Sequence, residues 1–479
     1  MALVVIATGV VAAMVISAST AEASSGFSQI SAGNYHTCAV TTSGGAECWG
    51  EGGDGELGDG TTANSSLPVD VSGLTGGVAE VSAGGFHSCA VTTSGGAECW
   101  GSNNPSGELG DGTTTDRDTP VDVSGLTSGV AEVSAGGNSS CALTTGGGVK
   151  CWGDNSFGQL GDGSTTGRDT PVDVSGLTSG VAAVSAGDGF TCALTTGGGV
   201  KCWGDNYFGQ LGDGNTTESD TPVDVSGLTS GVAEMSAGAG SVCALTTAGG
   251  AECWGDNANG ELGDGNTIES DTPVDVSGLT SGVAEVSAGG YQSCAVAAGG
   301  GTKCWGENND GDLGDGSTMD SHIPVDVVGL TSGVAEVSAG YRHTCAVATS
   351  GGADCWGYDE YGELGCNTIT YDIDKPVGVG FTATTTTLKL KWSKLSEGAN
   401  ERFTVTVTAT GFRPTGSIEI DVDGAYFASR VLKKARNKGK AILTLPMNVG
   451  LGSHTVQGVY EGAGQFSPSV SPVRTVVVS

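Results

Sequence analysis

Short stretches in which apolar and polar residues alternate recur along residues 27 to 380, and each is bounded by Gly, Ser, Asp or Asn. One representative segment reads VAEVSAGGFHSCAVTTSGGAECWGSNNPSGELGDGTTTDRDTPVDVSGLTSG. Such alternation between turn signals is typical of β-strands that bury one face. We predict four strands in this segment, with sequences V-A-E-V-S-A-G, H-S-C-A-V-T-T, A-E-C-W-G and T-P-V-D-V. The Gly-Gly pair between the second and third strands predicts a tight hairpin.

The segment is one unit of a repeat, because C-W-G occurs seven times at spacings of 51 or 52 residues. A fixed period of this length indicates stacked units that share a continuous core. Four strands per unit favour a seven-bladed β-propeller, although a linear solenoid would have the same period. The small Ser-Ala-Gly residues suit an innermost strand, and the Pro and Asp of T-P-V-D-V suit an outer edge. Two ring closures stay open: residues 376–380 beside residues 27–33, or one complete blade per repeat.

The repeat resembles that of the regulator of chromosome condensation family. The resemblance rests on a Gly followed by two variable residues and His, then W-G, then G-[EQD]-L-G, as in Gly158-Gln159-Leu160-Gly161. It covers about three quarters of the chain and implies a seven-bladed propeller. The His occurs only as His36, His87 and His343, and the last unit replaces L-G-D-G by Leu364-Gly365-Cys366-Asn367.

Residues 381–479 have a different pattern, without C-W-G and with period-two alternation. About 100 residues with short alternating strands indicate an immunoglobulin-like sandwich, and the segment resembles the bacterial Ig-like domains of surface proteins. The 86 glycines disfavour a helical bundle, because each Gly in a helix interior costs roughly 1 kcal/mol relative to Ala. The expected fold is therefore all-β: a seven-bladed β-propeller at residues 24–380 and a C-terminal Ig-like β-sandwich. The clearest predicted strands of the sandwich are Leu388–Trp392, Phe403–Thr408, Ser417–Val422, Ala441–Leu445 and His454–Tyr460.

The N-terminus reads as a secretory signal. Residues 3–16 form an apolar run of fourteen, which is short for a membrane span, and Ala21-Glu22-Ala23 fits a cleavage site. No Lys or Arg precedes the run, and a buried strand or helix is the alternative. We predict a signal peptide at residues 1–23 and a secreted or cell-surface protein.

Fourteen of the fifteen cysteines form seven pairs, each separated by ten residues. Each pair occupies the two arms of a predicted hairpin, where a cross-strand disulfide is accessible. Reduced core cysteines are the alternative, whereas C-x9-C is not a zinc spacing. Cys366 is left over, as a thiol or as a link between two chains. The expected disulfide cysteines are Cys38 and Cys48, Cys89 and Cys99, Cys141 and Cys151, Cys192 and Cys202, Cys243 and Cys253, Cys294 and Cys304, and Cys345 and Cys355.

The net charge is −34, from 53 Asp and Glu against 19 Lys and Arg, which argues against a nucleic-acid binder. The charge is divided unequally. Residues 1–380 hold 47 acidic and 7 basic residues, and residues 381–479 hold 6 and 12. Six of the bases lie in Arg430–Lys440. This segment is either a solvated hairpin loop or a contact for an anionic surface polymer or for the acidic propeller.

Two loops vary between repeats, one after the first strand and one after C-W-G, and both are expected on the same face of the ring. Ten of the twelve Phe and Tyr residues of the propeller lie in these loops. The Trp residues of C-W-G are predicted to be core wedges, and Phe157, Phe208, Tyr361 and the three His residues are expected to pack. The candidate ligand-binding residues are Tyr35, Phe86, Tyr207, Tyr291, Tyr341, Arg342 and Tyr358.

No catalytic set emerges, because the five His residues match no metalloprotease or nucleophile motif. The carboxylates recur mainly in turns such as L-G-D-G, where calcium binding is an alternative. We expect a non-enzymatic secreted or surface binding protein without cofactor or metal. Its propeller loop face would recognise a protein or glycan, with the Ig-like domain as spacer or surface contact. The alternatives are nucleotide exchange on a small GTPase, which the family resemblance implies, and a carbohydrate-active enzyme using acidic loop residues.

Overall fold

The computed structural model describes residues 26–380 apart from 104, 368, 370 and 371, and the backbone of ten strands between residues 384 and 478. The predicted signal peptide at residues 1–23 and the side chains after residue 380 lie outside the described residues. Every element in the described part of the chain is a β-strand. In that part, no helix has the length and hydrophobicity needed to cross a membrane.

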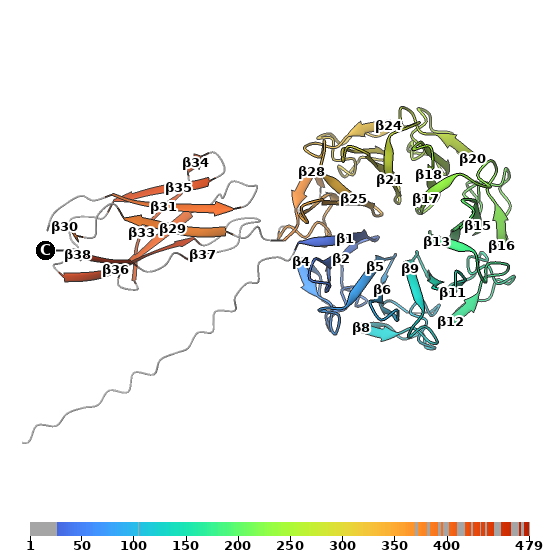
Figure 1. Cartoon of the computed structure of the whole chain (residues 1–479), viewed down its shortest axis with the longest axis horizontal. Helices are drawn as coiled ribbons and strands as arrows, with labels where there is room; N and C mark the ends of the chain where they lie inside the picture. The colour runs from blue at the N-terminus through green and yellow to red at the C-terminus, as the bar shows by residue number, and fades with distance from the viewer. Residues whose placement is uncertain are drawn as a thin grey trace, which may run out of the picture.

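Seven four-stranded antiparallel sheets form a closed ring (Figure 1). Each repeat is one blade, and its strands follow chain order from the axis outwards. The innermost strands are β1 (Phe27–Ala32), β5 (Val78–Ala83), β9 (Val130–Ala135), β13 (Val181–Ala186), β17 (Val232–Ala237), β21 (Val283–Ala288) and β25 (Val334–Ala339). The second strands are β2 (His36–Thr41), β6 (His87–Thr92), β10 (Ser139–Thr144), β14 (Phe190–Thr195), β18 (Ser241–Thr246), β22 (Gln292–Ala297) and β26 (His343–Ala348).

The third strand of each blade carries C-W-G, and the outermost strand carries P-V, which is part of T-P-V-D in the second to fifth blades. The third strands are β3 (Ala46–Gly50), β7 (Ala97–Gly101), β11 (Val149–Gly153), β15 (Val200–Gly204), β19 (Ala251–Gly255), β23 (Thr302–Gly306) and β27 (Ala353–Tyr358). The outermost strands are β4 (Ser65–Asp70), β8 (Arg117–Asp122), β12 (Arg168–Asp173), β16 (Ser219–Asp224), β20 (Ser270–Asp275), β24 (Ser321–Asp326) and β28 (Asp372–Gly378). The predicted strand order within a blade is confirmed.

The ring closes without exchanging a strand between its ends. β28 stays in the seventh blade beside β27, and β1 begins the first blade, so each repeat is a complete blade. The seventh blade holds the first through side chains: the Ile30 N–H donates to Glu336 Oε1 (3.2 Å) and the Ala32 N–H to Ser338 Oγ (2.9 Å). The same pattern links inner strands elsewhere in the ring, as where Val337 N–H donates to Glu285. These contacts satisfy backbone donors that the sheet edge would leave unpaired.

A second set of inter-blade hydrogen bonds surrounds the axis, at the glycine that follows each inner strand. The carbonyl of that glycine accepts an N–H from the preceding blade, from Asn34 to Gly84 (3.1 Å) and, at the closure, from Tyr341 to Gly33 (3.1 Å). A Cβ on Gly84 would lie 2.4 Å from the Gly136 oxygen, closer than nonbonded atoms approach. Glycine is therefore required at this position. The accepting glycines are Gly33, Gly84, Gly136, Gly187, Gly238, Gly289 and Gly340.

The seven C-W-G tryptophans are fully buried between blades, as predicted. Trp100, on the second blade, packs against first-blade residues such as Val40 and Leu57. Its Nε1–H donates to the Glu56 carbonyl (2.7 Å), which also accepts from Ser88 Oγ (3.1 Å). Each wedge is thus fixed by apolar packing and a buried hydrogen bond together.

All seven predicted cysteine pairs lie at disulfide distance, with Sγ–Sγ separations from 2.07 to 2.14 Å. In the first blade, Cys38 is directly opposite Cys48 in the β2–β3 register. The pairing prediction is confirmed. Cys366 lies outside these pairs and is buried with Phe27 and Trp49 at the junction of the seventh and first blades. This position does not favour a link to a second chain.

After residue 380, ten strands form two sheets, and each of the five predicted strands overlaps an observed one. The largest difference is at the first, which is observed at Thr384–Leu390 instead of Leu388–Trp392; residues 391 and 392 lie outside the described residues. Arg430–Lys440 includes the β34–β35 hairpin, where Lys433 is opposite Lys440. The strands are β29 (Thr384–Leu390), β30 (Lys394–Leu395), β31 (Arg402–Ala409), β32 (Ser417–Val422), β33 (Ala425–Val431), β34 (Lys433–Ala435), β35 (Lys438–Thr444), β36 (Gly452–Tyr460), β37 (Ser469–Val470) and β38 (Arg474–Val478).

Candidate functional site

The two variable loops of each blade lie on one face of the propeller, which we call the loop face. Strands alternate in direction, so the turn after the first strand and the connection after the third emerge together. Side-chain contacts show the same arrangement: Tyr35, from the first kind of loop, touches Tyr358 and Tyr361, from the second. Loop residues held by a rigid scaffold are suited to recognition.

Aromatic side chains from four adjacent blades meet on this face. Tyr35 is at the centre, with ring centroids 6.3 Å from Phe86, 6.0 Å from Tyr341, 6.3 Å from Tyr358 and 5.7 Å from Tyr361. Tilted and edge-to-face geometries of this kind are favourable between aromatic rings. We call this set, with the two residues described next, the aromatic cluster.

Tyr291 and Arg342 extend the cluster. The Tyr291 ring lies 4.8 Å from that of Tyr341, and their hydroxyls share a hydrogen bond of 2.5 Å. The Arg342 guanidinium lies 5.6 Å from the Tyr291 ring centroid, within cation–π range, and 3.4 Å from Asp310 Oδ2. Burial, followed by the bond to Tyr291, raises the pKa of Tyr341. The Tyr341 hydroxyl therefore stays neutral at physiological pH.

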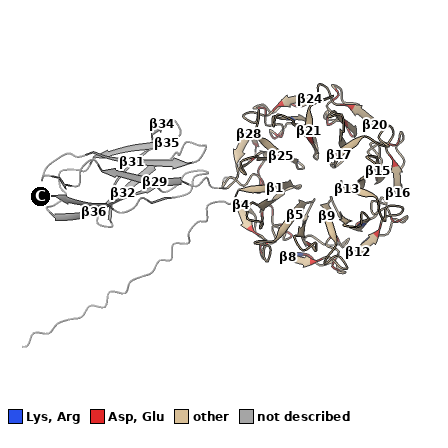
Figure 2. Cartoon of the chain, in the orientation of Figure 1, with Lys and Arg blue, Asp and Glu red and all other residues tan. Residues whose placement is uncertain are grey.

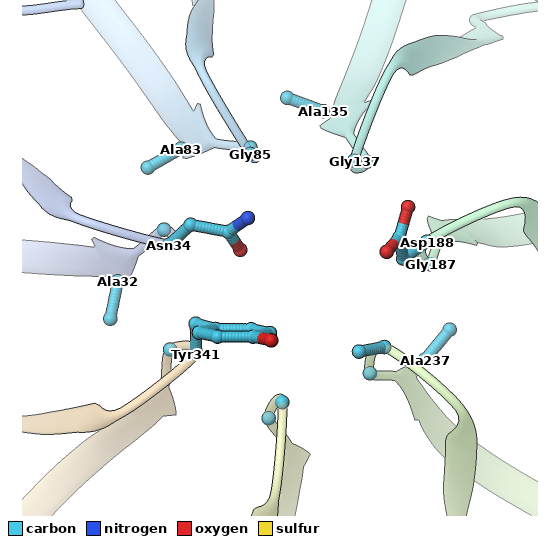
Figure 3. A pocket seen from close by; sticks show the side chains of 18 of the residues that line it. Ala32, Asn34, Ala83, Gly85, Ala135, Gly137, Gly187, Asp188, Ala237 and Tyr341 are labelled. Atoms are coloured by element: carbon cyan, nitrogen blue, oxygen red, sulfur yellow. The ribbon is translucent and has the colours of Figure 1, made fainter. Parts of the chain in front are cut away.

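A central pocket opens on the axis beside the aromatic cluster (Figure 3). Its wall is made by the last Ala of each inner strand and the two residues that follow it. Most wall positions are Ala or Gly. Larger side chains come from three blades: Asn34 and Tyr341 lie on one side, and Asp188 lies opposite them (Figure 3).

The side of the loop face opposite the aromatic cluster is acidic. Asp188 lies near Asp154 and Asp205, and burial followed by the charge of these two carboxylates raises the pKa of Asp188. The loop position after that of Asp188 is Tyr35 in the first blade and Tyr291 in the sixth. In the fourth and fifth blades the same position is glycine, Gly189 and Gly240. A Cβ atom on Gly189 would lie 3.4 Å from the Phe157 ring, and one on Gly240 would lie 3.5 Å from the Phe208 ring. The aromatic cluster and the Asp188 carboxylate thus lie on opposite sides of one pocket.

Six of the seven candidate residues come together in the aromatic cluster. The exception is Tyr207, which is 72% exposed and stacks edge-on with its neighbour Phe208 at 4.9 Å. Tyr361, expected only to pack, is part of the cluster. The pocket residues Asn34 and Asp188 were missed, although both occupy the variable position after the inner-strand glycine. Variation at that position was the available signal.

His36, His87 and His343 pack between blades, as expected. Each ring donates to or accepts from a hydroxyl of the next blade: His36 Nε2 lies 2.8 Å from Ser88 Oγ, and His343 Nε2 lies 2.8 Å from Thr37 Oγ1. Burial lowers the pKa of His36 and His343 to about 3 and that of His87 to about 4. These rings are neutral structural groups.

The L-G-D-G carboxylates accept hydrogen bonds from their own turns. Asp111 Oδ1 accepts from the Thr113 N–H (2.8 Å), and its other oxygen pairs with Arg117 (2.8 Å). Asp162 is held in the same way by Ser164 and Arg168. Among the residues that the structure describes, no three His, Cys, Asp or Glu side chains are grouped to hold a metal ion.

Comparison with protein families identifies both parts of the chain. Residues 381–479 match the bacterial Ig-like domain (group 3). The propeller matches two descriptions of the regulator of chromosome condensation (RCC1) repeat. One covers residues 46–91, 98–143, 147–194, 198–245, 253–296 and 304–347, and the other covers residues 27–56, 78–107, 130–159, 181–210 and 334–363.

The similar proteins include a receptor and a ubiquitin ligase. The ultraviolet-B receptor UVR8 of Arabidopsis thaliana is 32% identical over 344 residues, 70% of this chain and 78% of the receptor. Human E3 ubiquitin-protein ligase HERC2 is 32% identical over 67% of this chain, but the match spans only 7% of the ligase. In the crystal structure of Kap60 bound to yeast RCC1 (Prp20), an RCC1-like chain superposes with a TM-score of 0.62 at 21% identity, covering 74% of this chain and 85% of that one. This last likeness concerns the fold alone.

Proposed function

The chain belongs to the regulator of chromosome condensation repeat family, and on this basis we propose that it is an extracellular protein that binds a protein partner on its loop face. The aromatic cluster carries the proposal. Its rings are only partly buried, and Phe86 remains 38% exposed. Aromatic and Arg side chains supply most hot spots at protein interfaces. Relatives support protein binding in general, since yeast RCC1 has been crystallised with Kap60.

Secretion is the part of the proposal that rests on the cysteines. One disulfide per blade is expected in an oxidising compartment and is rare in cytosolic proteins. Whole-protein mass spectrometry of the natural protein under non-reducing conditions tests this. Seven bridges would lower the mass by about 14 Da relative to the reduced chain, because each bond removes two hydrogens. Cleavage after Ala23 would be read from the same spectrum. A full-length chain with free thiols would contradict the extracellular assignment.

The binding face is tested by variants taken from the chain's own repeats. Tyr341→Ala copies Ala239, and Tyr291→Asn copies Asn138, so both substitutions have precedents in the same loop. Each should lower the capture of partners from culture medium by at least tenfold, about 1.4 kcal/mol. Proteins retained by immobilised wild type and variants would be quantified by mass spectrometry.

The control is Ile323→Thr, which copies Thr272 and removes an exposed apolar side chain from an outermost strand, outside the aromatic cluster. It should leave capture unchanged. Equal capture by the wild type and both cluster variants, all with the same unfolding midpoint, would contradict the assignment of the face. Loss of capture after enzymatic removal of glycans from the medium would instead make the partner a glycan.

A further inference from the structure

The chemistry of the partner can be taken one step further on the premise of the proposed function. We propose that the central pocket accepts a Lys or Arg side chain of the partner, with the cation against Asp188 and adjacent apolar residues on the aromatic cluster. The pocket would then be the specificity element of the loop face, and the aromatic cluster would supply contact area.

The first observation is that Asp188 forms no ion pair with any Lys or Arg that the structure describes. Each of the seven Lys and Arg side chains of the described propeller pairs with another aspartate. Figure 2 shows how scarce Lys and Arg are in the ring. Asp188 projects into the central pocket from the side facing Asn34 and Tyr341 (Figure 3). A carboxylate in a pocket without a counter-charge favours an incoming cation.

The second observation is the negative electrostatic potential around the pocket. Asp154 and Asp205 are close enough to act on Asp188, and both add negative charge on the same side. Residues 1–380 carry 47 acidic side chains against 7 basic ones. A cleft lined by one sign of charge concentrates ligands of the opposite sign. The ammonium or guanidinium of a partner would therefore be drawn to the pocket, and bound cation would lower the pKa of Asp188.

The third observation is shape. The walls consist mainly of Ala and Gly from all seven blades, and they leave a narrow, solvent-open pocket on the axis. It accommodates one long side chain better than a folded element. The methylene stem of Lys or Arg can lie along alanine methyls and the Tyr341 ring while its charged end stays in a polar environment. The inner-strand glycine carbonyls already accept hydrogen bonds, and among the larger side chains of the wall Asp188 is the one that carries a negative charge.

A peptide library tests the proposal. Bead-bound nonapeptides have uncharged random residues on both sides of a central Lys, Arg, Gln or Glu, and fluorescent full-length oxidised protein is the probe. Wild type should label Lys and Arg beads about tenfold more than Gln beads, an effect that falls with added NaCl. Asp188→Asn, which copies Asn34, should reduce this preference to within about twofold while labelling of aromatic-rich Gln beads persists.

The converse variant and the aromatic variant complete the design. Asn34→Asp places a second carboxylate at the equivalent position of the first blade and should increase the preference for Lys and Arg. Tyr341→Ala should lower the labelling of all beads. A chain with the six bases of Arg430–Lys440 changed to Gln is measured in parallel. If only that chain labels beads, its own basic segment occupies the pocket and a separate partner is ruled out.

The outcomes separate this inference from the proposed function. Peptide labelling that depends on Tyr341 but not on the central residue overturns the cation pocket and leaves protein binding intact. A preference for Lys and Arg that survives Asp188→Asn also overturns it. If wild type labels no beads while Tyr341-dependent capture from medium succeeds, the pocket does not receive a peptide side chain. Failure of both measurements removes the proposed function itself.

Discussion

At the scale of single residues, glycine has different roles at different positions of the repeat. Gly84 follows an inner strand, and the Gly136 carbonyl lies where its Cβ would be. Gly76 is in the connection between the first and second blades, and no heavy atom beyond its chain neighbours lies within 4 Å of its Cβ position. Neither residue needs a positive φ. The requirement for Gly84 is therefore steric contact between blades.

Gly84→Ala should destabilise the propeller by about 2 kcal/mol, because the added methyl group separates two blades that share a backbone hydrogen bond. Gly76→Ala is the control and should be neutral or slightly stabilising, since it only restricts the unfolded chain. Denaturant unfolding of both variants measures the difference. Equal midpoints for the two would contradict the steric account.

At the scale of elements, the β3–β4 type of strand pair carries opposite or like charges according to the blade. Lys201 faces Asp224 and forms a 2.6 Å ion pair, whereas Glu252 faces Asp275 at the same position of the next blade. Burial, followed by the Asp275 charge, raises the pKa of Glu252. Like charges directly opposite each other on a sheet are destabilising.

Glu252→Lys should convert the repulsive pair into the arrangement of the fourth blade and raise stability at pH 8 by about 0.5 kcal/mol, the size of an exposed cross-strand pair. Lys201→Glu makes the reverse change and should lower stability by a similar amount. Thermal unfolding at low salt checks both. Changes of the same sign in the two variants would show that the charge pairing is not the cause.

At the scale of the whole molecule, two sets of buried groups give stability opposite dependences on pH. Burial raises the pKa of the inner-strand residues Glu80 and Glu285 to about 8 and of Glu132 and Glu336 to about 7. Their contribution is complete below the unfolded value near 4.5 and is lost as pH rises through 7 to 8. The three buried His residues act oppositely. Their contribution is complete above about 6.5 and is lost as pH falls toward their folded pKa values.

We therefore expect maximal stability at about pH 5 to 6, with a melting temperature at least about 5 °C above that at pH 8.5. Glu80→Gln copies Gln29, which accepts the equivalent inter-blade hydrogen bond from the Val81 N–H. This variant should lose less melting temperature than the wild type as the pH rises above 7. His87→Gln copies Gln292 and should lose less melting temperature than the wild type as the pH falls below about 6. Calorimetry from pH 4 to 9 checks all three proteins. A wild-type maximum above pH 8 would contradict the linkage.

The sequence predicted the local architecture in detail because its causes are local. The hairpin between β2 and β3 follows from turn residues and alternation, and these place Cys38 opposite Cys48. The aromatic cluster was predicted in composition but not in arrangement, as Tyr207 shows by lying apart. The G-[EQD]-L-G motif that follows Tyr361 predicts a packing role for this residue. Its contact with Tyr35 depends on the ring joining the seventh blade to the first.

By itself, the sequence determined the number of blades, the strand order, the disulfide pairs and the division of charge between the two regions. The first three follow from a period and from residues that meet within one repeat, and the division of charge follows from composition alone. Only the tertiary structure decided how the ring closes, which loops meet, and that Asn34, Asp188 and Tyr341 share one pocket. Residues so far apart in sequence are brought together by the rotation of each blade about the axis, which no local pattern encodes.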